Sequence, residues 1–588
     1  MKRKSTRMTR RQFLTGAGVA LTGAALACGR ARDLATLVAP TLTPTALPPT
    51  PDMTPLPKEL AADLLMLNGK IITVDPQDTI AEAVAVKDGC IQAVGTRADI
   101  ATLAGESTRI IDLGGRAVTP GLIDAHNHLQ VAGLLSSAYV AFLPPEVRTL
   151  DDLRDGLAEA LASRPEGEWL QGYFLVLSEG GLPTRHDLDP VSLNHPVWIL
   201  QQGGHYGSAN SLALQIAGIT AATPDPVGGV IERDASGEPT GVFYNHRAMD
   251  LLRLHIPRQT TDDVRQNILS SEPLFAAYGV TSYHDNNVRG VDTVHTYLDA
   301  GKRDELLLRG AVYYTLEWPG DLERALHEIE RYGDDFVRFA GFKFLLDGQA
   351  LMAYCHQPHN GVRWDFTTWD PQSFKDTVRA LHDTGLQICT HVIGDAAVDL
   401  TLDAYEEAMN ANPRSDPRHR LEHVILTRPE TTQRIKDLGV VVSTQPQFIR
   451  VGAEHWKEVF GEARMERIMV TREWLEAGIP LALGSDAPTT PWLTPQVTLA
   501  GAVGRFSPSD ATFEPDQCLT IQEALRAHTM GAAYAVHEED IKGSIEVGKL
   551  ADLVVWSEDP YTVSLQQLWQ IPMDLTLIGG EVIYDRTS

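Results

Sequence analysis

The sequence has little cysteine, no excess of basic charge, and no apolar run in its N-terminal segment long enough to span a membrane. Its five cysteines are scattered without a C-x-x-C pair, which argues against a cysteine zinc site and against a disulfide scaffold. The formal net charge is -27. Such an acidic chain is a poor partner for nucleic acid or anionic lipid, because binding phosphate groups requires a basic face.

The first 28 residues depart from this acidic average, with six basic residues and no acid. The motif "TRRQFL" at residues 9–14 resembles a twin-arginine export signal, and the apolar run that follows at 13–27 is too short and too rich in Gly and Thr for a stable membrane span. "ALAC" at residues 25–28 resembles a lipoprotein cleavage box with Cys28 as the lipidated residue. It departs from that pattern at Ala25, where a larger aliphatic residue is usual. We therefore expect export to the periplasm or another extracytoplasmic site, and the sequence leaves open simple cleavage or a lipid anchor at Cys28.

The remainder of the chain divides by composition. Residues 29–61 are rich in Pro and Thr and predict an extended linker. Residues 62–117 contain short apolar strands broken by Asn-Gly and Asp-Gly turns, and residues 538–588 show a similar pattern of short apolar strands and turns. These two ends predict one small β-sandwich built from both termini of the mature chain.

Between them, residues 118–537 alternate short apolar strands with helical patterns. Continuous apolar strands separated by helices indicate a parallel sheet covered on both sides, and eight such units indicate an α/β fold of the (β/α)8 TIM-barrel type. The interval of about 130–275 is too long for one crossover and predicts an inserted subdomain over the barrel mouth. The predicted strands cover residues 118–126, 279–285, 307–315, 339–348, 386–394, 419–424, 440–446 and 480–486.

Side chains suited to metal binding recur where these strands end, which is the rim that carries catalysis in such barrels. Imidazole and carboxylate are the ligands that a catalytic Zn²⁺ prefers, and residues i and i+2 of a strand point the same way, so an H-x-H pair can hold one ion. A lone strand histidine is more often a hydrogen-bonded core residue, and Lys343 could instead pair with Asp347 or line the barrel. The predicted rim set is His126, His128, Lys343, His391, His423 and Asp486.

These motifs resemble the amidohydrolase superfamily. The segments "PGLIDAHNH", "LEHV" and "GSDAP" carry the likeness, and "FKFLLDG" with "HVIGDAAVDLTLDAYE" is similar to family-3 amidohydrolases, the group that includes N-substituted formamide deformylases. The resemblance covers about residues 62–588. It implies that His126, His128 and Asp486 hold one metal, that His391 and His423 hold a second, and that Lys343 is carboxylated and bridges them. Without carboxylation we expect one metal; Zn²⁺ is the expected ion, with Mn²⁺ and Fe²⁺ as alternatives.

The resemblance also implies a substrate contact in the insertion. His205, in "GGHYGSANSLAL", is expected to face the substrate, with a structural role in the insertion as the alternative. The residues at the end of the second predicted strand, His284 and Asp285 in "TSYHD", are candidates either for the pocket or for supporting the metal ligands from behind. Glu422, beside His423, could brace the site or be paired elsewhere. Asp486 and His391 are the expected catalytic residues, with Asp486 as general base.

The sequence therefore predicts a metal-dependent hydrolase that cleaves a non-peptide carbon–nitrogen bond, of amide or formamide type, in a small molecule by metal-activated hydroxide. Hydrolysis of esters, lactones or cyclic amides and amidines is the alternative, because the metal site is common to all of them. An exported binding lipoprotein is the rival from another class. The sequence predicts no nucleic-acid partner and no membrane contact beyond lipidation of Cys28, and it leaves a homo-oligomer open.

Overall fold

The computed structural model describes most of the chain after the predicted signal and linker. The export motif, Cys28 and nearly all of the linker lie outside the described residues. Among the helices that are described, none has the length and apolarity needed to cross a membrane. The described residues are 59–143, 146–175, 177, 181–201, 203–358, 367–490, 493–507 and 509–587.

The centre of the molecule is an eight-stranded parallel sheet that curls into a barrel. Each strand pairs with the next along the chain, and the last lies beside the first, where Asp486 N donates to His126 O at 2.7 Å and His128 N donates to Ala487 O at 2.8 Å. The predicted (β/α)8 fold is confirmed. The strands are β8 (Leu122–Asn127), β15 (Val280–Val288), β16 (Arg309–Thr315), β17 (Val337–Leu345), β18 (Gln387–Val392), β19 (Arg420–His423), β20 (Val441–Thr444) and β21 (Leu481–Leu483).

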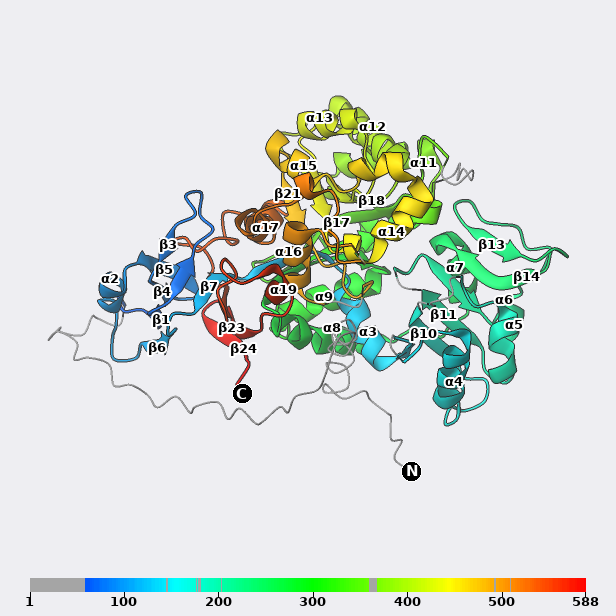
Figure 1. Ribbon diagram of the computed structural model, residues 1–588, viewed down its shortest axis with the longest axis horizontal. Helices are drawn as coiled ribbons and strands as arrows, with labels where there is room; N and C mark the ends of the chain where they lie inside the picture. The colour runs from blue at the N-terminus through cyan, green and yellow to red at the C-terminus, as the bar shows by residue number, and fades with distance from the viewer. Residues whose placement is uncertain are drawn as a thin grey trace.

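Helices surround this barrel (Figure 1). Their inward faces pack on nearly continuous apolar strands; every residue of β16, for example, is buried, as expected of a parallel sheet covered by helices. Polar caps mark where they begin: the Asp370 side chain accepts from Ser373 N ahead of α11, which satisfies a helix-end amide. The helices are α3 (Leu129–Ser137), α8 (Thr261–Ala276), α9 (Val291–Lys302), α10 (Leu322–Glu328), α11 (Pro371–Asp383), α12 (Asp395–Ala411), α13 (Pro429–Asp437), α14 (Phe448–Phe460), α15 (Thr471–Ala477), α16 (Pro495–Gly504), α17 (Ile521–Ala527) and α18 (Met530–Tyr534).

Two further sheets form a sandwich at one end of the molecule, where the blue and red ends of the described chain meet (Figure 1). Apolar side chains from both termini share its core, among them Leu64, Ile71, Leu553 and Leu577. One sheet contains β5 (Cys90–Gly95), β4 (Ala83–Lys87), β1 (Leu64–Leu67) and β6 (Arg109–Asp112). The other contains β24 (Glu581–Asp585), β23 (Met573–Ile578), β22 (Leu553–Trp556), β7 (Ala117–Pro120), β2 (Lys70–Ile72) and β3 (Ile80–Ala81).

The predicted first barrel strand, 118–126, is in fact two strands. Its first half, β7, pairs with β2 and β22 in the sandwich, and its second half, β8, belongs to the barrel. The chain changes sheets at Gly121, where a Cβ atom would lie 2.1 Å from Thr281 Oγ1. The sequence could not show this break, because both halves are buried and hydrophobic periodicity does not identify the partner sheet.

The insertion forms a six-stranded sheet with short helices beside the barrel mouth (right in Figure 1). It ends earlier than predicted, since α8 packs on α3 and β15 in the helical layer of the barrel. Its strands are β9 (Tyr139–Ala141), β10 (Leu170–Leu175), β11 (Val197–Gln201), β12 (Tyr206–Ala209), β13 (Val230–Arg233) and β14 (Pro239–Tyr244). Its helices are α4 (Leu150–Leu161), α5 (Arg185–Leu188), α6 (Ser211–Ala217) and α7 (Asn245–Arg253).

Candidate active site

A cavity of about 730 Å³ lies between the C-terminal rim of the barrel and the insertion. All six predicted metal ligands line it, although they come from five different strand ends separated by up to 360 residues (from His126 to Asp486). The insertion contributes a second wall that includes Tyr173 and His205. The fold therefore brings the predicted set together in one space large enough for a small organic molecule.

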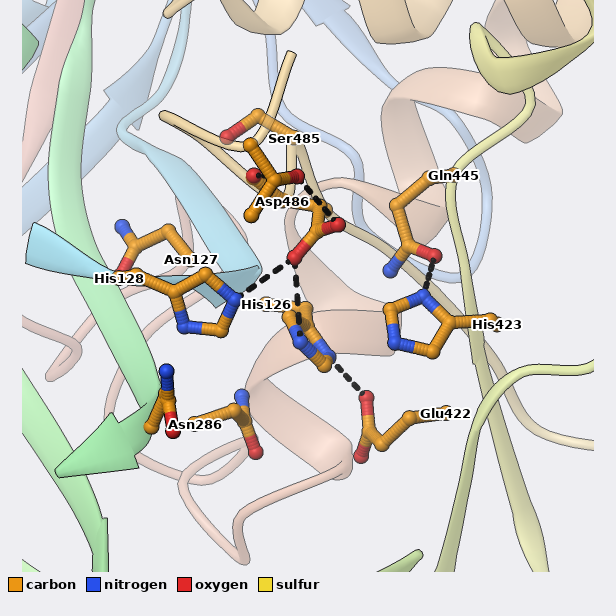
Figure 2. A network of polar contacts seen from close by, with 12 residues as sticks. His126, Asn127, His128, Asn286, Glu422, His423, Gln445, Ser485 and Asp486 are labelled. Atoms are coloured by element: carbon orange, nitrogen blue, oxygen red, sulfur yellow. Dashed lines mark hydrogen bonds and ion pairs between the residues drawn. The ribbon is translucent and has the colours of Figure 1, made fainter. Parts of the chain in front are cut away.

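The H-x-H pair and the carboxylate of Asp486 form one side of this cluster (Figure 2). Asp486 Oδ1 lies 2.9 Å from His128 Nε2 and 3.4 Å from His126 Nε2. Ligand atoms of His126, His423 and Asp486 all fall within 4.8 Å of one another. Burial alone would raise the pKa of Asp486, but its hydrogen bond to His128 and the neighbouring imidazoles hold that pKa well below the ordinary value, so Asp486 is a carboxylate at neutral pH.

Glu422 sets the orientation of His126. Its Oε2 lies 2.6 Å from His126 Nδ1, and its Oε1 lies 2.7 Å from Arg420 Nε. Burial opposes ionisation of Glu422, but the charges of Arg420 and Lys343 outweigh it and keep the Glu422 pKa below the ordinary value. An ionised Glu422 can only accept a hydrogen bond, so Nδ1 of His126 carries the proton and Nε2 keeps its lone pair for a metal. The predicted bracing role of Glu422 has this geometric basis.

Gln445 holds His423 in the same way. Gln445 Oε1 lies 2.7 Å from His423 Nδ1 (Figure 2), and an amide oxygen can only accept, so Nε2 of His423 carries the lone pair. His423 and Asp486 both have positive backbone φ, 73° and 53°. Non-glycine residues held in this region are strained, and such strain clusters at functional sites.

We expect Gln445→Leu to weaken metal binding roughly 10–100-fold, because removing an outer partner of a ligating histidine has effects of that size. Titration of the apoenzyme with Zn²⁺ in the presence of a competing chelator measures it. Gln433→Leu is the control, since Gln433 lies on the exposed face of α13 and bonds only Asp437 among the described residues. Equal metal affinity in the two variants would contradict the role assigned to Gln445.

His391 and Lys343 complete the cluster. The His391 ring lies 4.6 Å from that of His423. Lys343 is 1% exposed, and no hydrogen bond or ion pair joins its Nζ to the part of the chain that the structure describes. The alternative ion pair between Lys343 and Asp347 does not form, since the Asp347 carboxylate accepts hydrogen bonds from the backbone N–H groups of Ile393 and Gly394. Burial penalises the ammonium form and lowers the pKa of Lys343 despite nearby acids.

The donor set fits a divalent metal. Nε2 of His126 and Nε2 of His391 are buried without a hydrogen-bond partner among the described residues, whereas buried polar atoms are normally paired. Burial lowers the pKa of both imidazoles and brings that of His423 to about 4. Neutral imidazoles next to a carboxylate are the ligands expected for Zn²⁺ and similar ions.

The three predicted substrate contacts have different outcomes. His205 lines the cavity, with its ring 4.9 Å from that of His391, and burial lowers its pKa to about 3. His284 and Asp285 do not line the cavity. His284 contacts Ala125 O and Arg420 inside the barrel, and Asp285 accepts from Tyr297 Oη. They lie too early in β15, which runs on to Val288.

Several residues of the site were not predicted. Asn286 and Asn287 line the cavity where His284 and Asp285 were expected, and extending the second predicted strand by two residues would have found them. Gln445 lies near the end of the predicted strand 440–446, and a search for polar residues at strand ends, which located His423, could have found it. His246 and Arg253 come from helix α7 of the insertion, where no sequence pattern marks them.

The comparisons with known proteins agree with this geometry. The sequence profile described as "Amidohydrolase family" matches residues 109–584. This chain belongs to the amidohydrolase family. The predicted resemblance is thereby confirmed, and the chain is an enzyme that acts on carbon–nitrogen bonds other than peptide bonds.

This amidohydrolase is 31% identical to the N-substituted formamide deformylase of Arthrobacter pascens over 547 residues, which cover 90% of this chain and 99% of that one. It is 28% identical to the putative amidohydrolase YtcJ of Bacillus subtilis strain 168 over 538 residues, covering 88% and 99% of the two chains. Its fold resembles that of an uncharacterised metal-dependent hydrolase from Pyrococcus horikoshii OT3, with a TM-score of 0.69, 23% identity, and coverage of 85% and 99%.

Proposed function

We propose that this amidohydrolase is a metal-dependent hydrolase of small amides, with formamides of N-substituted amines as the first class to test. The observation that carries the proposal is the convergence of buried, neutral imidazoles and the Asp486 carboxylate on the cavity. His126, His128 and Asp486 would hold one divalent ion, and His391 and His423 a second. Zn²⁺ is the proposed ion, with Mn²⁺ and Fe²⁺ as alternatives.

When bound, such ions lower the pKa of water and polarise a carbonyl. The protein's own residues supply the proton chemistry. Asp486, a carboxylate at neutral pH, accepts the proton of the water that attacks the amide carbon and passes it to the leaving nitrogen. His205, neutral because of its burial, is placed at the cavity wall to hydrogen-bond the substrate carbonyl oxygen as negative charge develops there.

We propose that Lys343 is carboxylated. The unprotonated Nζ attacks the carbon of CO2, forms an N–C bond and loses one proton, so the product is a carbamate with a negative charge. The burial that lowers the pKa of Lys343 increases the fraction of amine able to react. The resulting anion would stand beside His126, His391 and His423, where an ammonium group would oppose metal binding.

A hydrolysis screen tests the proposed function. The purified enzyme, loaded separately with Zn²⁺, Mn²⁺ or Fe²⁺ and assayed with bicarbonate, is offered N-benzylformamide, N-acyl amines, cyclic amides, esters and lactones. We expect amine release from the formamide or acyl amine, and metal bound in stoichiometric amount by ICP-MS. A protein that binds no metal, or that cleaves only esters and lactones, would overturn the proposal.

A further inference from the structure

The cavity wall carries positive charge in an acidic protein. Of the charged residues that line the cavity, Lys343 and Asp486 belong to the predicted metal centre, and the others are Arg253 and Arg289. The chain has 77 acidic residues, yet within the described ranges Asp486 is the one carboxylate on the lining. Outside the metal centre, the charged groups that a substrate meets there are therefore both guanidinium groups.

The acids that form ion pairs with these arginines do not line the cavity. Arg289 Nη1 pairs with Glu317 Oε1 at 2.5 Å, and Arg253 Nη1 lies 3.4 Å from Asp250 Oδ1. Neither acid is on the cavity lining. The contact of Arg253 with Asp250 is long, and burial lowers the pKa of Arg253 despite that partner. Arg253 is thus a partly desolvated cation whose ion pair is long and shared, because Asp250 Oδ1 also lies 3.7 Å from Arg289 Nη1.

His246 joins the two arginines. Arg289 Nη2 lies 3.1 Å and Arg253 Nη1 lies 3.4 Å from His246 Nδ1. A guanidinium group can only donate, so Nδ1 is the acceptor and the neutral ring carries its proton on Nε2. The His246 ring lies 4.8 Å from that of His205, which in turn lies 4.9 Å from that of His391. His205 and His246 therefore lie between the predicted metal ligand His391 and the two arginines.

We propose that Arg253 and Arg289, held beside each other by His246 Nδ1, form a subsite for a carboxylate of the substrate. A guanidinium group binds a carboxylate through two parallel N–H···O bonds. Tyr139 and Tyr173 also line the cavity and favour an aromatic body between the two ends. The substrate class is then an amide or formamide of an amine that bears a carboxylate remote from the scissile bond. This inference rests on the proposed hydrolase function.

The test compares two formamides of equal size with the metal-loaded enzyme: N-(4-carboxybenzyl)formamide and N-(4-carbamoylbenzyl)formamide. We expect wild-type kcat/KM to favour the carboxylate. In Arg253→Gln this preference should fall roughly 10–100-fold, as expected for loss of a charged hydrogen bond, mainly through KM. Arg247→Gln is the matched control, because Arg247 lies on the same helix and does not line the cavity; it should keep the preference.

Equal hydrolysis of both compounds by the wild type, or a preference that survives in Arg253→Gln, would overturn the subsite. If neither compound is cleaved, it is the proposed reaction that fails. The subsite is then judged by calorimetry with 4-methylbenzoate and 4-methylbenzamide. Tighter binding of the acid by the wild type, lost in Arg253→Gln, supports it, and equal binding of the two ligands contradicts it.

Discussion

Asp486→Asn is expected to lower kcat by roughly 10²–10⁴-fold, the range typical of losing a general base. The change removes the negative charge and the proton acceptor while keeping the shape of the side chain. Asp486 Oδ1 lies 2.9 Å from His128 Nε2, so metal affinity should fall as well. Steady-state kinetics on a substrate from the formamide screen, with metal content measured on the same preparation, separates the two effects.

Asp321→Asn is the matched control. Asp321 is 4% exposed, close to the 7% of Asp486, and its carboxylate accepts from Tyr314 Oη and Arg324 Nε rather than lining the cavity. It should keep close to wild-type kcat. Full activity of metal-loaded Asp486→Asn, with circular dichroism unchanged in both variants, would remove Asp486 from the proposed mechanism.

Lys343→Ala is expected to lower kcat/KM by roughly 10²–10³-fold, the scale of losing one electrostatic group at a reacting centre, and to reduce bound metal from two ions to one. Removing CO2 during metal loading should impair the wild type, and bicarbonate should restore it. ICP-MS gives the metal content, and carbon NMR with isotopically labelled bicarbonate detects the carbamate.

Lys343→Arg discriminates between a modified and an unmodified lysine. Arginine keeps the positive charge but cannot form the carbamate at neutral pH, because its guanidinium group stays protonated. We expect it to be as impaired as Lys343→Ala. An active Lys343→Arg enzyme, or a wild type indifferent to bicarbonate, would show that the positive charge is what the site requires and that carboxylation is wrong.

The fold and the metal cluster could be predicted because both depend on short-range patterns. Eight continuous apolar runs identify buried parallel strands, and the polar residue that ends such a run is placed on the catalytic rim. His126, His391, His423 and Asp486 were found in this way although they are far apart in the sequence. The rule needs no knowledge of which helix packs where, so the rim was predicted together with the barrel.

The remaining features depend on three-dimensional packing. Gly121 separates two strands of equal hydrophobicity, so only the pairing of β7 with β22 reveals the change of sheet. The predicted second strand ends too early, after His284 and Asp285, because β15 continues to Val288. Arg253 reaches the cavity from a helix of the insertion, and the direction of such a helix is set by the tertiary structure rather than by a local pattern.

The pairing of β7 with β22 has a consequence for the order in which the enzyme matures. The strand that leads into His126 is anchored by residues 553–556, and Trp556 Nε1 also donates to Thr119 Oγ1 at 2.9 Å. During synthesis, every ligand from His126 to Asp486 has emerged before this anchor exists. We therefore expect the position of His126 to be fixed only once residues 553–556 have been synthesised and have paired with β7.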